Sequence, residues 1–479
     1  MSRSDRRTRL EHLEQEIPQL KLHLKQLEEE RREIFASLAF PVLTLPMEVT
    51  SEIFVHCLPG ASAIPRTTDA PLLLARICRQ WRDIALSLPQ LWSTFTFYAD
   101  SPRSQARDHL INCWLSRSRH HSLSICLYDG YMEPEDDTAV AQGSEYERAV
   151  AISESIQACL ELVGKHSSRL RDLQLRLMPS ELQNPSISFP EGGFPLLEHL
   201  AIGRWAASHA DFTLARINLF GTAPRLRSVE MVLDSQGHID IRLFSIPWAQ
   251  LTKFTGTLFW PEECFFVLRQ CPALVDCTFA ECTSEDTAVP PPPLPPIIAL
   301  KSLKVGTTYS LFTVFGALTL PRLETLSAEL GVGHISLVTQ LVARSGCTLR
   351  HFKFTWTVDG NETQFFDCLQ HMPALSSLEL SAIPPKPCVA IFDRLCEDLE
   401  LVPDLRSLTI VSYNITPSFP FATLLAMLHA RSRPARLTPL RRFQLCGAYD
   451  WGIIDLSGFE ELVREGMEIE MRSPRRILL

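Results

Sequence analysis

The sequence lacks the features that would assign the chain to a membrane, secreted or nucleic-acid-binding class. No apolar run approaches the roughly 18 residues that a membrane span requires. Residues 1–9 carry four arginines and no apolar core, so we expect no secretory signal peptide. The formal net charge is −9, and no long basic stripe is present that could neutralise a row of phosphates. We therefore expect a protein of the cytoplasm, the nucleus or both, with neither nucleic acid nor membrane as a partner.

Motifs for catalysis and metal binding are also missing. The sequence contains no phosphate-binding GxxxxGK loop, no GxGxxG, no GxSxG and no HExxH. Its 14 cysteines include no CxxC pair, which favours reduced thiols over disulfides or zinc ligands. The densest group has spacings longer than those of zinc sites and is expected to pack as small hydrophobic side chains: Cys264, Cys271, Cys277 and Cys282. We expect no catalytic residue, no metal and no cofactor.

The 479 residues, 46% of them apolar and 21% charged, can form more than one folded unit. The first is predicted over residues 1–40, where apolar residues recur in steps of three and four between charged ones: Leu10, Leu13, Ile17, Leu20, Leu24, Leu27, Ile34 and Leu38. Arg31 takes one apolar position, and Pro18 should kink or delay the helix. The pattern fits a coiled coil that binds a partner or self-associates, and equally a single helix folded back onto the next domain.

Residues 41–92 contain two stretches with helical spacing. In the first, Pro46 suits the initial helical turn, where its missing backbone donor costs nothing. The apolar residues that follow it are Val49, Ile53 and Phe54. A second helix is predicted from Pro71, with one apolar stripe: Leu73, Ile77, Trp81 and Ile84. Because such short helices cannot bury both faces alone, an external partner is expected.

This segment resembles the F-box, in the version common in mushroom-forming fungi. The residues that match its pattern are Leu45, Pro46, Glu48, Ile53, Phe54, Cys57, Leu58, Cys78, Trp81, Arg82, Asp83, Pro89, Leu91 and Trp92. The resemblance implies docking on the small Skp-family adaptor of a cullin–RING ubiquitin ligase. The implied contact residues are Leu45, Pro46, Val49, Ile53 and Phe54. Trp81 and Trp92 are expected in the core, because large aromatic side chains dominate small cores.

After residue 165 a unit recurs with the pattern L-x-x-φ-x-φ, where φ is usually apolar. Its first leucines are Leu170, Leu197, Leu226, Leu251, Leu274, Leu300, Leu323, Leu349, Leu375, Leu405 and Leu440. Most of the intervals lie within the roughly 20 to 29 residues of leucine-rich repeats. Helices are predicted between the strands over 149–163, 262–269, 335–344, 365–370, 420–430 and 458–464. The pattern predicts an irregular solenoid in which stacked leucine ridges form one core.

The residue between the two φ positions should face away from that core, because side chains alternate along a strand. These residues are Gln174, Ala201, Glu230, Thr255, Thr278, Lys304, Ser327, Lys353, Glu379, Thr409 and Gln444, none of which is a large hydrophobe. We expect a target protein to contact this row through Glu230, Lys304, Lys353, Glu379 and Thr409. An acidic segment, residues 129–147, is predicted to be a solvated insertion.

Taken together, the sequence predicts an α/β protein in three parts. Residues 1–40 form an N-terminal helix or coiled coil, and residues 41–95 form a small all-α F-box. Residues 96–479 form a leucine-rich-repeat-like solenoid of parallel strands with helices on the outer face. The implied function is that of a non-catalytic, substrate-recruiting subunit of a Skp–cullin–F-box ubiquitin ligase. The alternative is an F-box-bearing repeat scaffold that binds proteins outside any ligase.

Overall fold

The computed structural model describes residues 3–38, 42–60, 64–99, 105–129, 145–177, 181–182, 192–203, 216–232, 240–257, 260–280, 294–308, 315–330, 335–356, 362–412, 419–433, 438–447, 456–473 and 476–477. The chain divides into two compact units. Unit 1 comprises Met1–Gly60 and Pro65–Trp92, and unit 2 comprises Ala61–Ile64 and Ser93–Leu479. Among the described helices, none has the length and apolar character needed to cross a membrane.

Every element described in unit 1 is helical. In chain order they are α1 (Arg3–Leu38), a 3-10 turn (Val42–Thr44), α2 (Met47–His56), α3 (Leu74–Ile77), α4 (Arg79–Ser87) and a second 3-10 turn (Pro89–Trp92). Helix α1 continues through Pro18. The single helix predicted from Pro71 is wrong, since the chain forms two helices broken at Cys78. The backbone of Cys78 is extended. The Sγ atom of Cys78 accepts a hydrogen bond from the Trp81 amide at 3.4 Å, which caps α4.

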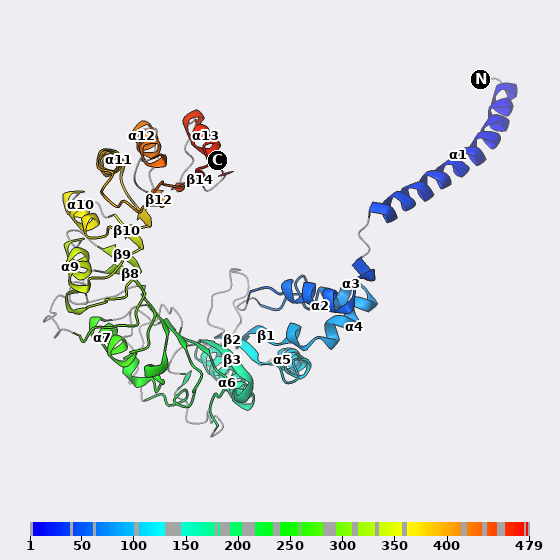
Figure 1. The fold of residues 1–479 in the computed structure, drawn as a ribbon. Helices are drawn as coiled ribbons and strands as arrows, with labels where there is room; N and C mark the ends of the chain where they lie inside the picture. The colour runs from blue at the N-terminus through cyan, green and yellow to red at the C-terminus, as the bar shows by residue number, and fades with distance from the viewer. Residues whose placement is uncertain are drawn as a thin grey trace. The chain divides into compact units, whose positions relative to one another are not determined.

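Unit 2 is an α/β structure built on one sheet, whose strands follow one another in chain order from β1 to β15 (Figure 1). The strands are β1 (Thr94–Ala99), β2 (Leu123–Asp129), β3 (Leu170–Arg176), β4 (His199–Ile202), β5 (Ser228–Val232), β6 (Lys253–Thr257), β7 (Asp276–Phe279), β8 (Ser302–Thr308), β9 (Thr325–Leu330), β10 (His351–Thr355), β11 (Ser377–Ser381), β12 (Ser407–Ser412), β13 (Arg442–Gly447), β14 (Glu468–Ser473) and β15 (Arg476–Ile477). All described neighbours pair in parallel except β14 and β15, which are antiparallel.

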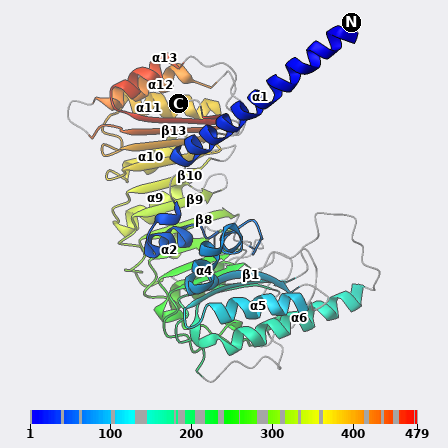
Figure 2. The ribbon, with the colours of Figure 1, turned by 90° about the vertical axis from the view of Figure 1, so that its right-hand side faces the viewer.

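Helices connect many of the strands and cover one face of the sheet (Figures 1 and 2). They are α5 (Gln105–Arg117), α6 (Glu145–Lys165), α7 (Pro261–Gln270), α9 (Ile335–Ser345), α10 (Glu362–Gln370), α11 (Pro385–Glu397), α12 (Phe421–Ser432) and α13 (Ser457–Arg464). A strand–helix–strand connection returns the chain to the same edge of the sheet, so that consecutive strands lie parallel and side by side. The predicted α/β class is therefore confirmed, as is a solenoid-like repeat of strands and helices.

The predicted strand register is confirmed from β3 to β13. The inward positions pair from strand to strand in one continuous ridge: Leu173, Leu200, Val229, Phe254, Cys277, Leu303, Leu326, Phe352, Leu378, Leu408 and Phe443. Each of these side chains is buried, as are the leucines that begin the repeats. The ridge supplies the hydrophobic stabilisation that no single repeat could supply alone.

Besides the two-residue β15, three strands lie outside the predicted repeat pattern: β1, β2 and β14. In each, the residue at the leucine position is not leucine: Trp92 before β1, Ser122 before β2 and Gly466 before β14. In β2 the register also shifts by one residue between Leu123 and Ser124, so that Leu123 pairs with Leu170. Helices α5 and α11 were also not predicted.

The acidic segment over 129–147 is not one insertion. Asp129 is the last residue of β2 and is buried. Position 145 is the first residue of α6. Within this segment, residues 130–144 lie outside the described part of the chain.

Polar side chains join neighbouring repeats by bonding to main-chain atoms. Buried Arg431, near the end of α12, donates to carbonyl oxygens at the end of α11 and in the turn after it: Leu395 (2.8 Å), Asp398 (2.9 Å), Leu401 (2.9 Å) and Val402 (3.3 Å). Arg344, at the end of α9, donates in the same way to the Phe315 and Leu318 carbonyls at 2.6 and 2.9 Å. Leu395 lies in the last turn of α11, where carbonyls have no intrahelical donor, and the other acceptors of Arg431 lie in the turn after that helix.

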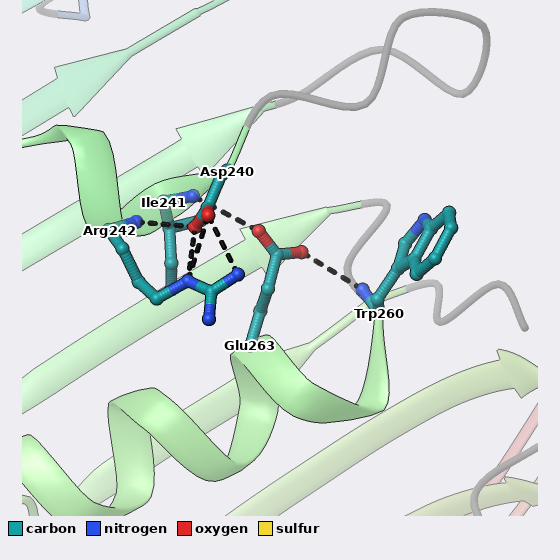
Figure 3. A network of polar contacts seen from close by, with 5 residues as sticks. All are labelled: Asp240, Ile241, Arg242, Trp260 and Glu263. Atoms are coloured by element: carbon teal, nitrogen blue, oxygen red, sulfur yellow. Dashed lines mark hydrogen bonds and ion pairs between the residues drawn. The ribbon is translucent and has the colours of Figure 1, made fainter. Parts of the chain in front are cut away.

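A buried carboxylate plays the corresponding role at the start of α7 (Figure 3). Glu263 accepts the amide of Ile241 on Oε1 and the amide of Trp260 on Oε2, both at 3.0 Å. Beside it, Asp240 accepts the amide of Arg242 at 2.9 Å and also pairs with its guanidinium. One side chain thus ties the first turn of α7 to the preceding segment.

Candidate interaction surfaces

Helix α2 of unit 1 is apolar on two faces, and the unit buries only one of them. The buried face carries Thr50 and Phe54. Phe54, 1% exposed, packs edge-on against Trp81 with 4.9 Å between ring centroids. The adjacent face carries Val49 and Ile53, and Ile53 is 43% exposed. An apolar helix face that its own fold does not cover marks a surface for another molecule.

Further apolar side chains of unit 1 are exposed, on α2 itself and on the other helical elements. We call them, with Val49 and Ile53, the apolar surface of unit 1; they are Leu43, Met47, Leu73, Ile77 and Leu86. A shallow depression of about 620 Å³ lies between the start of α2 and α4, lined by Met47, Arg79, Gln80, Asp83, Ile84 and Ser87. The surface therefore combines exposed apolar groups with a recess of side-chain size and charged groups at its edge.

The sequence-predicted contact residues of this unit fall into two groups. Leu45 is half-buried, whereas Pro46, Val49 and Ile53 are exposed. Phe54 does not belong with them, because it lies in the core and supports α2 from inside. Phe54 lies one turn after Thr50, so both side chains are on the face of α2 that meets the core.

The core of unit 1 holds the two tryptophans differently. Trp92 is fully buried, and its Nε1 donates to the Ala85 carbonyl at 2.8 Å. Trp81 is half-buried against Phe54.

Pro46 precedes α2 as its N-cap residue, and its carbonyl accepts the Thr50 amide at 3.0 Å. These contacts fix α2 so that Val49 and Ile53 point outward.

In unit 2 the face of the sheet away from the ridge carries one residue per strand in register. We call this set the central row: Thr96, Cys126, Gln174, Ala201, Glu230, Thr255, Thr278, Lys304, Ser327, Lys353, Glu379, Thr409, Gln444 and Glu470. The expected alternation of side chains is confirmed, because the whole predicted row lies on this face. Glu470 extends it by one strand beyond the prediction.

Most charged members of the central row already have partners. Glu230 pairs with Arg176 at 2.8 Å, and Lys353 pairs with Glu379 at 2.6 Å. By contrast, Lys304 is exposed and has no ion pair among the residues that the structure describes. A target carboxylate can bond to Lys304 without first breaking an existing pair, which makes it the charge of the row best placed for binding.

The last strands of the row form a chain of polar contacts. Thr409 donates to Gln444 at 3.2 Å, and Gln444 donates to Glu470 at 2.5 Å. The hydrogen bond from Gln444, together with Arg472 beside it, lowers the pKa of the Glu470 carboxyl. Glu470 therefore stays ionised at neutral pH and accepts further donors.

At the other end of the row lies a group that sequence reasoning missed, which we call the tyrosine–arginine cluster: Tyr98, Tyr128 and Arg176. The three residues pair in register on β1, β2 and β3, two positions after the central row. The two tyrosine rings stack with 5.2 Å between centroids, and both are half-buried. Burial raises the pKa of Tyr128, so its hydroxyl stays protonated at neutral pH. Tyrosine and arginine dominate the energetic centres of protein interfaces.

The described residues contain no group of His, Cys, Asp or Glu that could hold a metal ion. Cys264, Cys271 and Cys277 are buried, while Cys282 lies outside the described residues. Burial raises the pKa of the Cys271 thiol to about 12, which leaves it without nucleophilic thiolate at neutral pH.

The fold and its two surfaces define a parallel α/β repeat protein joined to a small helical unit. A comparison with models of known protein families finds no match, and a comparison with curated proteins finds none either.

Proposed function

We propose that the chain is a substrate-recruiting subunit of a Skp–cullin–F-box ubiquitin ligase. Unit 1 binds the small Skp-family adaptor, and the open face of the sheet in unit 2 holds a target protein. The observation that carries the proposal is α2, whose Val49 and Ile53 stay exposed although its other face is fully packed. The resemblance of residues 41–92 to the F-box names the partner that this surface fits.

On the sheet, the target is held at two places. The tyrosine–arginine cluster supplies rigid aromatic area and a planar donor, the composition of an energetic hot spot. Lys304, which has no ion pair among the described residues, supplies a positive charge farther along the row. The subunit performs no chemistry of its own. It raises the effective concentration of a target lysine near the thioester-bound ubiquitin that other subunits carry.

Co-purification of the full chain with adaptor and cullin tests the first half of the proposal. Leu45→Ala combined with Pro46→Ala should lose the adaptor. Ile53→Glu should weaken binding by at least about 100-fold, because it places a charge in an apolar contact. Val463→Glu on α13 is the matched control, since Val463 is 42% exposed and Ile53 is 43% exposed. It should bind as the unmodified chain does.

The outcomes separate the two functions that the sequence leaves open. Capture of adaptor and cullin together supports the ligase role. Capture of the adaptor without cullin supports a repeat scaffold outside the ligase. If Ile53→Glu folds and still binds the adaptor at full strength, the apolar surface of unit 1 is not the docking surface.

A further inference from the structure

Helix α1 presents an apolar seam that no described part of the chain covers. The seam residues whose side chains the structure describes are Ile17, Leu20, Leu24, Leu27 and Ile34, and all are exposed. Their steps of three, four, three and seven residues place them on one side of the helix. No described residue covers this side of α1, which leaves it available to another molecule.

We propose that α1 pairs with α1 of a second copy of this chain as a parallel, two-stranded coiled coil. In heptad terms Ile17 and Leu24 occupy a positions, and Leu20, Leu27 and Ile34 occupy d positions. Each side chain inserts between four residues of the facing helix, which buries the row that is exposed in the single chain. This pairing does not depend on the proposed ligase role.

The charges beside the seam favour a second copy in parallel orientation. In a parallel pair, each g position faces the e position five residues later in the other helix. Glu16 then faces Lys21 of the second copy, and His23 faces Glu28. Both pairs join an acid to a basic group. Within one helix the Glu16 carboxylate lies 3.2 Å from the His12 ring nitrogen, and both side chains are exposed. The same carboxylate can also accept Lys21 of the second copy.

Two residues that interrupt the pattern are compatible with a dimer. Arg31 takes an a position, where a single polar residue fixes register and oligomer state at some cost in stability. Its long side chain can reach water from a two-stranded seam more readily than from the closed core of a larger bundle. Pro18 takes the b position, away from the contact, so its missing donor lies on the solvent side.

The mass of the full chain in solution, measured by light scattering over a dilution series, tests the proposal. The unmodified chain of 54.1 kDa should give twice that mass at high concentration. Leu20→Glu should give the monomer mass. Leu22→Glu is the matched control, because Leu22 is 61% and Leu20 60% exposed on the same helix, but Leu22 occupies the f position, outside the seam. It should remain dimeric.

A charge exchange tests the orientation. Lys21→Glu should raise the dissociation constant by roughly two- to ten-fold, and adding Glu16→Lys should restore it. Residues 16 and 21 are too far apart along one helix to pair, and in an antiparallel dimer e faces e and g faces g. Restoration therefore supports the parallel pair, whereas its failure overturns the orientation. A monomeric unmodified chain, a trimer mass, or a dimer that survives Leu20→Glu overturns the proposal itself.

Discussion

Replacing Arg431 by methionine should loosen the contact between the repeats that α11 and α12 form. The guanidinium is 3% exposed and donates to four main-chain carbonyls between Leu395 and Val402. Burial lowers the pKa of this guanidinium, as expected for a cation taken out of water. Methionine keeps much of the aliphatic volume but donates no hydrogen bond. The four carbonyls therefore lose this donor without a large cavity, and those of Asp398 and Val402 keep one backbone amide each.

The loss in the free energy of unfolding is the difference between two opposing effects. Each hydrogen bond from a charged donor contributes about 1.5–3 kcal/mol, so four of them would exceed 6 kcal/mol if they were additive. Burying the guanidinium costs several kcal/mol, and the substitution recovers that cost. We expect a net loss of about 3–5 kcal/mol, because each buried carbonyl left without a donor costs about 1–3 kcal/mol.

Because a solenoid opens repeat by repeat, the assay must be local. Native-state hydrogen exchange should show amides of the last turn of α11 and of residues 398–402 exchanging at least about 100-fold faster. Arg433→Met is the control, because that side chain is 72% exposed and pairs with Glu465 at 2.7 Å. It should change exchange by less than about five-fold. Equal effects of the two substitutions would refute the role assigned to the buried carbonyl contacts.

Three further substitutions or conditions test the packing described above. Phe54→Ala should destabilise unit 1 by about 3–5 kcal/mol, measured by denaturant unfolding of the full chain with the fluorescence of the adjacent Trp81 as one probe. Glu263→Gln should cost about 1–3 kcal/mol, measured as faster exchange of the Ile241 and Trp260 amides, because the amide group of glutamine can accept only one of the two backbone donors. Raising the pH above 9 should reduce stability. The Cys271 thiol has a pKa of about 12 when folded against an ordinary value of 9.0, so the unfolded chain loses its proton first.

Each of these three predictions has a control in the same chain. Val49→Ala, on the exposed face of α2, should cost less than about 1 kcal/mol. Glu262→Gln, beside Glu263 but exposed, should leave exchange unchanged. Cys57 is exposed and should react with a thiol reagent in the folded protein, whereas Cys271 should react only after unfolding. Rapid labelling of Cys271 under native conditions would contradict its placement in the core.

The leucine pattern was sufficient to predict the sheet from β3 to β13, including which side of each strand is buried. It succeeded because every repeat must contribute to one continuous ridge, which forces the same spacing on every strand. It missed β1, β2 and β14, where Trp92, Ser122 and Gly466 replace the leucine. Those strands end the array or contain a register shift, so the constraint on them is weaker.

The candidate surfaces were only partly predictable. The positions of Glu230 and Lys304 on the open face follow from alternation alone. The pairing of Glu230 does not, because its partner Arg176 lies two strands away and two positions past the residue in register with Glu230. The small residue Ala201 takes that register position on the strand between them. The tyrosine–arginine cluster was missed together with the strands that carry two of its members. The burial of Phe54 depends on which face of α2 meets Trp81, which spacing within α2 alone cannot decide.

The central row has a consequence for how the specificity of such a protein can change over time. Adjacent strands are about 4.8 Å apart, so the row from β1 to β14 samples a bound molecule in equal steps over roughly 60 Å along the curve of the sheet. Ridge and row occupy alternate positions, so a substitution at an exposed row position alters one step and changes no ridge side chain; Thr96, Cys126 and Ala201 of the row are buried. Single substitutions can therefore change the binding specificity of the open face one residue at a time, while the repeat domain keeps its stability.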